Sequence, residues 1–216
     1  ITKQDRWEEN AVYTPFTLAA EIAGLLAAAD LAELCDDTDG AAMAGFLRDT
    51  ADAWEAALGD WIYVTGTDLA HAAGVTGYYV RIAPPVPGEA RSASHGTVEV
   101  RNRDMMSAAM PADSLVSADT LPLLRFGLRA PHDPRITDSV RVIDHVLRNE
   151  LPTGPGWRRY NGDGYGEHDD GRPFDGTGVG RVWPLLAAER AHYELAAGRK
   201  AEAEKLLVVM EANASP

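Results

Sequence analysis

The sequence predicts an all-α protein, and two observations carry this prediction. Six segments repeat apolar residues at helical spacing, and most of them are rich in alanine. Residues typical of helix ends flank them, such as Thr14-Pro15 before the first segment and Gly198 after the fifth. Helices with apolar stripes need neighbours to cover them, so six in series indicate part of a larger helical assembly rather than a closed bundle. The expected helices cover residues 15–35, 43–61, 119–128, 134–147, 183–197 and 200–213.

The first two segments predict a helical hairpin. Thr14 suits the N-cap because its side-chain oxygen can accept a free backbone N–H, and Pro15 has no N–H to lose at the first helical position. Polar residues at 36–40 end this helix. The second helix has a wide apolar stripe from Met43 to Trp61. Two long helices joined by a turn of about five residues are expected to pack antiparallel.

Two stretches break the helical pattern. Residues 62–116 contain strand candidates at 78–82 and 98–103 and a proline-rich loop at 84–88. Residues 152–182 are the least regular, with dense Gly and Pro among charged and aromatic residues. Long ordered excursions between helices often carry function.

The chain is acidic, with 33 Asp and Glu against 20 Lys and Arg in 216 residues and a net charge of −13. This balance argues against a nucleic-acid partner and against an anionic membrane surface. The apolar share of 45% and charged share of 25% are ordinary for a globular protein, and the length suggests one domain or two small ones. A single cysteine, Cys35, rules out an intrachain disulfide and argues against a thiolate zinc site or an iron–sulfur cluster.

The sequence does not favour a membrane span. The longest apolar stretch, residues 15–34, is interrupted by Glu21, Asp30 and Glu33, which a bilayer would tolerate only at a cost. No signal peptide is visible. The chain begins at Ile1 rather than Met, so this observation says little about location.

Two adjacent carboxylates, Glu8 and Glu9, follow Trp7 just before the first helix. A carboxyl group packed against an indole is partly desolvated, which raises its pKa and suits it to act as a general acid. Acidic residues also stabilise helix starts electrostatically, so Glu8 and Glu9 can simply be solvated residues before a helix. On residue types alone, this structural role is the more common one. Both interpretations stay open at this point.

Two regions near the C-terminus are further candidates. Glu189 lies among apolar neighbours in the fifth helix. It is either a group that takes part in the chemistry or a surface residue paired with Arg190 or with a neighbour on the helix. Residues 157–167 alternate aromatic and hydrogen-bonding side chains on a Gly-rich backbone, a pattern that suits a sugar with stacking faces and a hydroxyl rim. A calcium loop is excluded there because Arg172 stands where a bidentate Glu is needed, and neither Gly-rich run has phosphate-loop spacing. The six histidines show no metal-ligand spacing.

Three long runs together resemble glycoside hydrolase family 15. The run QDRWEENAVYTPFTLAAEIAGL is similar to the general-acid segment of bacterial glucoamylases and glucodextranases. The run GPGWRRYNGDGYGEHDDGRPFDGTGVGRVWPLLAAERAHYELAAG resembles the substrate-loop and catalytic-base segment of that family. The stretch RFGLRAPHDPRITDSVRVIDHVL between them is also similar. The resemblance covers nearly the whole chain and is loosest over residues 65–115.

The resemblance implies an (α/α)6 barrel, of which residues 1–216 would supply the C-terminal half of the catalytic domain. The upstream half would belong to the same parent chain or to a second polypeptide. By matching positions, Glu8 would be the general acid and Glu189 the general base. The substrate-binding residues would be Trp7, Glu9, Arg159, Tyr160, Asp163 and Trp183. The sequence departs from the family pattern in two places. Ala188 and Ala191 stand on either side of the Glu189-Arg190 pair, where relatives usually have glycine, and the stretch at 83–88 is short and proline-rich.

The implied activity is that of an inverting exo-glucosidase of glucoamylase or glucodextranase type, which releases glucose from the non-reducing end of an α-glucan. A trehalase-like member of the same family is an alternative, and a non-catalytic helical fragment that binds carbohydrate or needs a partner is another. The resemblance implies no required cofactor; it admits calcium, but no ligand set is legible. It also favours an extracellular location. The sequence does not distinguish α-1,4, α-1,6 and trehalose substrates.

Overall fold

The computed structural model describes residues 4–35, 38–84, 96–166, 168 and 170–214, and it is mostly helical. The predicted helical class is therefore confirmed. The α-helices are α1 (Pro15–Glu33), α2 (Thr38–Ile62), α3 (Asp68–Ala73), α4 (Leu121–Arg125), α5 (Pro134–Leu147), α6 (Pro184–Ala196) and α7 (Lys200–Ala212), with short 3-10 turns η2 (Ala112–Ser114) and η3 (Ala118–Thr120). The strands are β1 (Tyr63–Thr65), β2 (Gly77–Tyr79), β3 (Thr97–Glu99), β4 (Ala109–Pro111), β5 (Arg148–Leu151) and β6 (Gly154–Trp157).

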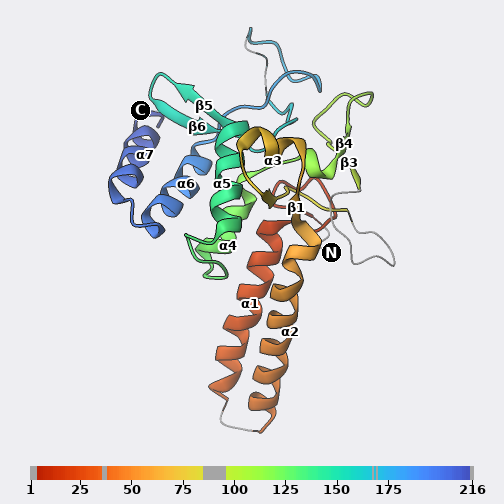
Figure 1. The fold of residues 1–216 in the computed structure, drawn as a ribbon, viewed down its shortest axis with the longest axis vertical. Helices are drawn as coiled ribbons and strands as arrows, with labels where there is room; N and C mark the ends of the chain where they lie inside the picture. The colour runs from red at the N-terminus through yellow and green to blue at the C-terminus, as the bar shows by residue number, and fades with distance from the viewer. Residues whose placement is uncertain (1–3, 36–37, 85–95, 167, 169, 215–216) are drawn as a thin grey trace.

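Helices α1 and α2 form a long antiparallel hairpin that stands out from the rest of the molecule (Figure 1). As predicted, Thr14 caps α1, because its Oγ accepts a hydrogen bond from the backbone N–H of Thr17 at 3.2 Å. Toward the outer end, Arg48 of α2 pairs with Asp30 at 2.8 Å and with Glu33. The predicted hairpin is confirmed; at its outer end α1 stops at Glu33, slightly earlier than expected, and α2 begins at Thr38, earlier than the expected start at Met43.

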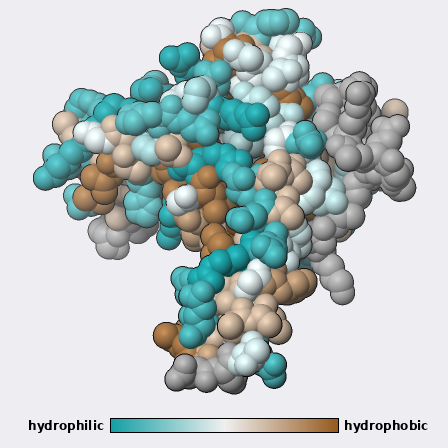
Figure 2. Space-filling model, turned by 60° about the horizontal axis from the view of Figure 1, so that its bottom comes forward, coloured by the Kyte–Doolittle hydropathy of each residue, from teal (hydrophilic) through white to brown (hydrophobic). Residues whose placement is uncertain are grey.

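The hairpin leaves much of its apolar surface uncovered. A helix that is apolar all round is normally surrounded by other elements, yet α1 buries mainly one side. Large apolar side chains are exposed near the outer end, namely Leu31, Leu34, Met43 and Phe46, and Figure 2 shows apolar surface on the projecting hairpin. Within the described ranges α1 is also the one helix long and apolar enough to cross a membrane, a test that core helices of soluble proteins pass as well.

Helix α5 lies in the body of the molecule, beside the α6–α7 hairpin and α3 (Figure 1). Asp133 caps it as predicted, since its carboxylate accepts the backbone N–H of Arg135 at 2.8 Å. The buried stripe of α5 faces β2, where the backbone N–H of Tyr79 donates to Ser139 Oγ at 3.0 Å. Burial of that stripe, Ile136, Val140, Ile143 and Leu147, makes α5 the centre of the core.

Three small antiparallel sheets surround this core, with Val64 opposite Tyr78, Val98 opposite Met110, and Asn149 opposite Gly156. The strands expected at 78–82 and 98–103 are shorter, at Gly77–Tyr79 and Thr97–Glu99. Helix α3 and strands β1, β4, β5 and β6 were not predicted, because elements of three to six residues are too short to show a period. Residues 85–95, which include most of the expected proline-rich loop, lie outside the described ranges.

A second hairpin, α6–α7, places the predicted base. The chain turns at Gly198, which has a φ of 78°, in the left-handed region that glycine adopts freely. The sequence predicted the end of the helix at this glycine. Helix α6 packs on α4 and β6. Bridges at Ser117–Tyr160 and Arg158–Val182 tie the irregular segment 158–183 to the body. The N-terminal segment and α6 consequently meet on one side of the core.

Candidate active site

A tight turn at residues 5–9 holds the predicted general acid. The Asp5 carboxylate accepts the backbone N–H groups of Trp7 at 3.1 Å and Glu9 at 2.9 Å, and the Asp5 carbonyl accepts that of Glu8 at 3.0 Å. Glu8 has a φ of 61°, and it is the one non-glycine residue with positive φ in the part of the chain that the structure describes. A left-handed conformation costs a side-chain-bearing residue on the order of 1–2 kcal/mol. Such a conformation persists where the surroundings over-determine it, and it is frequent at functional sites.

The Glu8 side chain is exposed. The expected desolvation of this carboxyl group against Trp7 is therefore not found in this chain. The Trp7 indole instead packs edge-on against Trp183, with ring centroids 5.5 Å apart. This contact joins the N-terminal turn to the start of α6.

Glu9, in contrast, is buried at the centre of a hydrogen-bond network. Its Oε2 accepts from Arg81 Nη2 at 2.7 Å and from the Tyr160 hydroxyl at 2.6 Å. Its Oε1 accepts from Asn102 and pairs with Arg159 Nη1 at 3.3 Å. Burial raises the pKa of Tyr160, so its hydroxyl stays protonated and remains a donor. Glu9 is thereby fixed in one orientation from four sides.

Arg159 connects this network to the aromatic residues. Its guanidinium forms a two-pronged ion pair with Asp163, at 2.7 and 2.8 Å. It also lies 5.0 Å from the ring centroid of Trp7 and 5.5 Å from that of Trp183. A planar cation held among aromatic rings and carboxylates is rigid. When a sugar lies beside it, this guanidinium can donate hydrogen bonds to the sugar hydroxyls.

Glu189 lies in the second turn of α6 and is buried, with 6% of its surface exposed. Its carboxylate is held by Arg6, through Nη2 to Oε1 at 2.8 Å and Nη1 to Oε2 at 3.1 Å. Arg6 Nη1 also donates to Asp119 Oδ1 at 3.2 Å. Three residues far apart in the sequence therefore meet at the predicted base.

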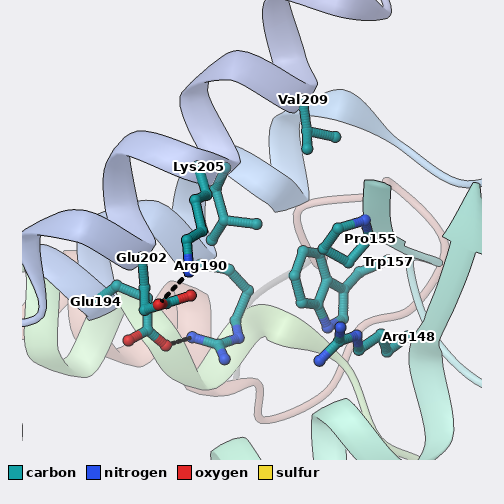
Figure 3. Close-up of a pocket in the computed structure, with 9 residues that line it drawn as sticks. Arg148, Pro155, Trp157, Arg190, Glu194, Glu202, Lys205 and Val209 are labelled. Carbon is teal, nitrogen blue, oxygen red and sulfur yellow. Dashed lines mark hydrogen bonds and ion pairs between the residues drawn. The ribbon is translucent and has the colours of Figure 1, made fainter. Parts of the chain in front are cut away.

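The neighbouring Arg190 points to the other side of α6, and the alternative of a Glu189–Arg190 pair is wrong. Arg190 pairs with Asp144 of α5 at 2.7 Å. It also pairs with Glu194 at 2.8 Å, and these two residues line a cleft between α6, α7 and β5–β6 (Figure 3). Asp144 also accepts the Trp157 indole N–H at 2.8 Å. These contacts fix the rotation of α6 and thereby direct Glu189 toward Arg6. The helix is regular across Ala188 and Ala191, so alanine at these two positions leaves the local backbone helical.

The structure brings most of the predicted residues into one contact network, consisting of Trp7, Glu9, Arg159, Tyr160, Asp163 and Trp183. Glu189 joins this region through Arg6, and Glu8 lies in the turn between Trp7 and Glu9. Residue-type reasoning did not identify Arg6, Arg81, Asn102 and Asp119. Arg6 could have been identified from the sequence, because it directly precedes Trp7 in the run that resembles the general-acid segment. No sequence pattern pointed to the other three residues.

No group of three or more His, Cys, Asp or Glu side chains in the described ranges is arranged to hold a metal ion. Apart from Glu8, the charged groups of the site described above are paired with one another. The arrangement offers one exposed carboxyl group on a constrained turn, one buried carboxylate on a helix, and an arginine among aromatic rings. These are the components of acid–base chemistry on a polyhydroxylated substrate.

Comparison with known proteins agrees with this interpretation. The sequence profile of glycosyl hydrolases family 15 matches residues 1–213. A glucoamylase from Clostridium sp. (strain G0005) is 37% identical over 201 residues, which are 93% of this chain and 26% of that protein. The crystal structure of a bacterial glucoamylase complexed with acarbose matches with a TM-score of 0.81 and 35% identity, over 96% of this chain and 28% of that one.

These matches confirm the predicted resemblance and fold class, the helical (α/α)6 barrel. The chain spans little more than a quarter of the length of both relatives. Its assignment to the C-terminal half of a barrel stays a prediction.

Proposed function

The chain belongs to glycosyl hydrolase family 15, and from that premise we propose that it carries the acid–base pair of an inverting exo-glucosidase. The proposed reaction releases glucose from the non-reducing end of an α-glucan. One observation carries the proposal more than any other: Arg6, two residues before Glu8, holds the carboxylate of Glu189 from 183 positions away in the sequence. Folding thus joins the two segments that must cooperate.

In this mechanism Glu8 protonates the glycosidic oxygen, and Glu189 removes a proton from the water that attacks the opposite face of the sugar. An inverting pair needs about 6.5–9.5 Å between its carboxyl groups to admit that water, whereas about 5 Å would indicate a nucleophile and retention. The oxocarbenium-like transition state is positively charged, so a carboxylate-rich site stabilises it. Both proton transfers use side chains of the chain itself, and we therefore expect the reaction to need no cofactor; treatment with a chelator tests whether calcium is required.

For substrate binding, we propose that Arg159 donates hydrogen bonds to hydroxyls of the terminal glucose, with Trp7 and Trp183 stacking beside it. Support comes from the ion pair that orients Arg159 and from its position among the rings. Glu9, Tyr160 and Asp163 are buried, so we expect them to act largely by holding Arg159 and the turn that carries Glu8.

The catalytic proposal is tested with the full-length protein that contains these residues. It is incubated with maltooligosaccharides, isomaltose, dextran and trehalose, and the anomer first released is identified by NMR. Hydrolysis of α-1,4 or α-1,6 glucans with β-glucose as the first product is expected. Release of α-glucose would contradict inversion, and cleavage of trehalose alone would indicate a trehalase-like enzyme.

A second candidate is a non-catalytic helical fragment that folds with a partner. The exposed apolar side chains of the α1–α2 hairpin favour it, because they require a cover that the described residues do not provide. The upstream part of the same barrel is the partner that we propose for that surface. Failure of the full-length protein to hydrolyse all four substrates would favour the non-catalytic candidate.

A further inference from the structure

We propose that Arg6 and Asp119 form a positioning pair for Glu189, in which Arg6 orients the carboxylate and Asp119 holds Arg6. This inference rests on the proposed role of Glu189 as general base. Arg6 and Asp119 touch neither water nor sugar in this proposal; they act through Glu189.

The geometry of Arg6 supports this role. Its guanidinium forms two parallel hydrogen bonds with Glu189, an arrangement that fixes both the distance and the plane of the carboxylate. The Arg6 side chain is itself confined, since its guanidinium lies 4.6 Å from the ring centroid of Phe16 and 4.7 Å from that of Trp7. Phe16 belongs to the first turn of α1, so the orientation of Glu189 depends on the hairpin as well as on α6.

Asp119 is the second carboxylate that contacts the Arg6 guanidinium. It lies in η3 and is 1% exposed, and its Oδ1 accepts from Arg6 at 3.2 Å. Its second oxygen, Oδ2, is buried and has no hydrogen-bond partner among the residues that the structure describes. A buried carboxylate with an unsatisfied oxygen is costly. A contribution to the site would account for its presence.

Charge explains what Asp119 contributes. When Glu189 accepts a proton from water, its ion pair with Arg6 is weakened. Asp119 shares the same guanidinium, so Arg6 keeps a charged partner at that moment and the proton transfer costs less. Removing the Asp119 charge should therefore slow the step in which Glu189 deprotonates water.

This contribution depends on pH. Burial raises the pKa of Asp119 to about 6. Repulsion from Glu189 also raises this pKa, whereas attraction to Arg6 and Arg81 lowers it. Above pH 6 the carboxylate is charged and assists Glu189. Below pH 6 it is protonated and neutral, and the assistance is lost.

The test is the pH dependence of kcat and KM for Asp119→Asn, which keeps the shape of the side chain and removes its charge. At pH 7.5 we expect kcat to fall by about tenfold, the effect of one nearby charge on a proton-transfer group, with KM within about twofold of wild type. At pH 5 the ratio of wild-type to variant kcat should approach one, because Asp119 is already neutral there. A loss that is the same at both pH values, or no loss, would overturn the inference.

Two comparisons complete the experiment. Arg6→Lys keeps the charge and loses the two-pronged contact, so it should lower kcat at every pH between 5 and 7.5. Asp138→Asn removes a carboxylate from Arg141, an exposed arginine of α5 outside the site, and its kcat ratio to wild type should not change with pH. If wild type is active but Glu189→Gln is as active as wild type, the proposed base is wrong. If Glu189→Gln is inactive and Asp119→Asn behaves as wild type, only the positioning pair is wrong; an inactive wild type removes both.

Discussion

Glu8 and Glu189 have opposite surroundings, and each suits its proposed role. Glu8 is exposed on a turn with positive φ, where a substrate can reach it, whereas Glu189 is buried and held in place by two hydrogen bonds from Arg6. Glu8→Gln and Glu189→Gln preserve side-chain shape and remove proton transfer. We expect each to lower kcat by about two to four orders of magnitude with an unchanged melting temperature for Glu8→Gln. Glu21→Gln, at an exposed position of α1, is the matched control, and near-wild-type rates in either site variant would exclude that residue from the mechanism.

Arg159 allows a separate prediction about binding. Lysine in its place keeps the charge but cannot form the two-pronged pair with Asp163 or the planar contacts with Trp7 and Trp183. Arg159→Lys should raise KM for a maltooligosaccharide about tenfold or more, and Arg141→Lys, on the exposed side of α5, should not change it. An unchanged KM in Arg159→Lys would show that this guanidinium does not contact the sugar.

At the same scale, sequence reasoning identified the residues that we propose as reacting groups, but not the residues that hold them in place. Glu8, Glu189 and Arg159 stand in long recognisable runs, so their positions could be predicted one by one. Asp119 and Arg81 lie in stretches without such a pattern, and their contacts with Arg6 and Glu9 exist only after the chain has folded. The incorrect Glu189–Arg190 pair has a different cause: adjacent residues of a helix point in different directions, and a pairing inferred from residue types alone ignores that geometry.

Among the elements, α6 depends on the contacts of Arg190. Arg190→Ala would leave Asp144 and Glu194 without this partner, and breaking a buried ion pair on one side costs about 3–5 kcal/mol. Because Asp144 is partly exposed, we expect a loss of about 3 kcal/mol in the free energy of unfolding, measured by urea denaturation of the catalytic domain. Arg141→Ala removes an exposed arginine and should change stability by less than about 0.5 kcal/mol. Equal effects of the two variants would contradict a structural role for Arg190.

The elements also show where sequence patterns suffice. Long helices with caps, such as α1 after Thr14 and α5 after Asp133, were predicted to within a few residues, because period and capping chemistry agree. The η3–α4 segment was expected as one helix at 119–128 and is a 3-10 turn followed by a short helix. Strand pairs such as β5–β6 depend on partners rather than on their own pattern. The irregular stretch at 152–182 could be predicted from composition as a candidate functional region, but its path across the core could not.

For the whole molecule, the uncovered surface of the α1–α2 hairpin leads to the last prediction. Leu34 and Phe46 are 79% and 65% exposed, and uncovered apolar surface promotes association or requires a partner. We expect residues 1–216 alone to self-associate and to bind a hydrophobic dye. Addition of the upstream part of the barrel should abolish both and give a one-to-one complex, as measured by light scattering. Leu34→Lys with Phe46→Lys should reduce self-association and weaken that complex, whereas Met105→Lys, an exposed apolar residue in the turn at 101–107, should do neither. A chain that is monomeric, compact and cooperatively folded alone, without dye binding, would show that the hairpin needs no cover and that the barrel is not divided here.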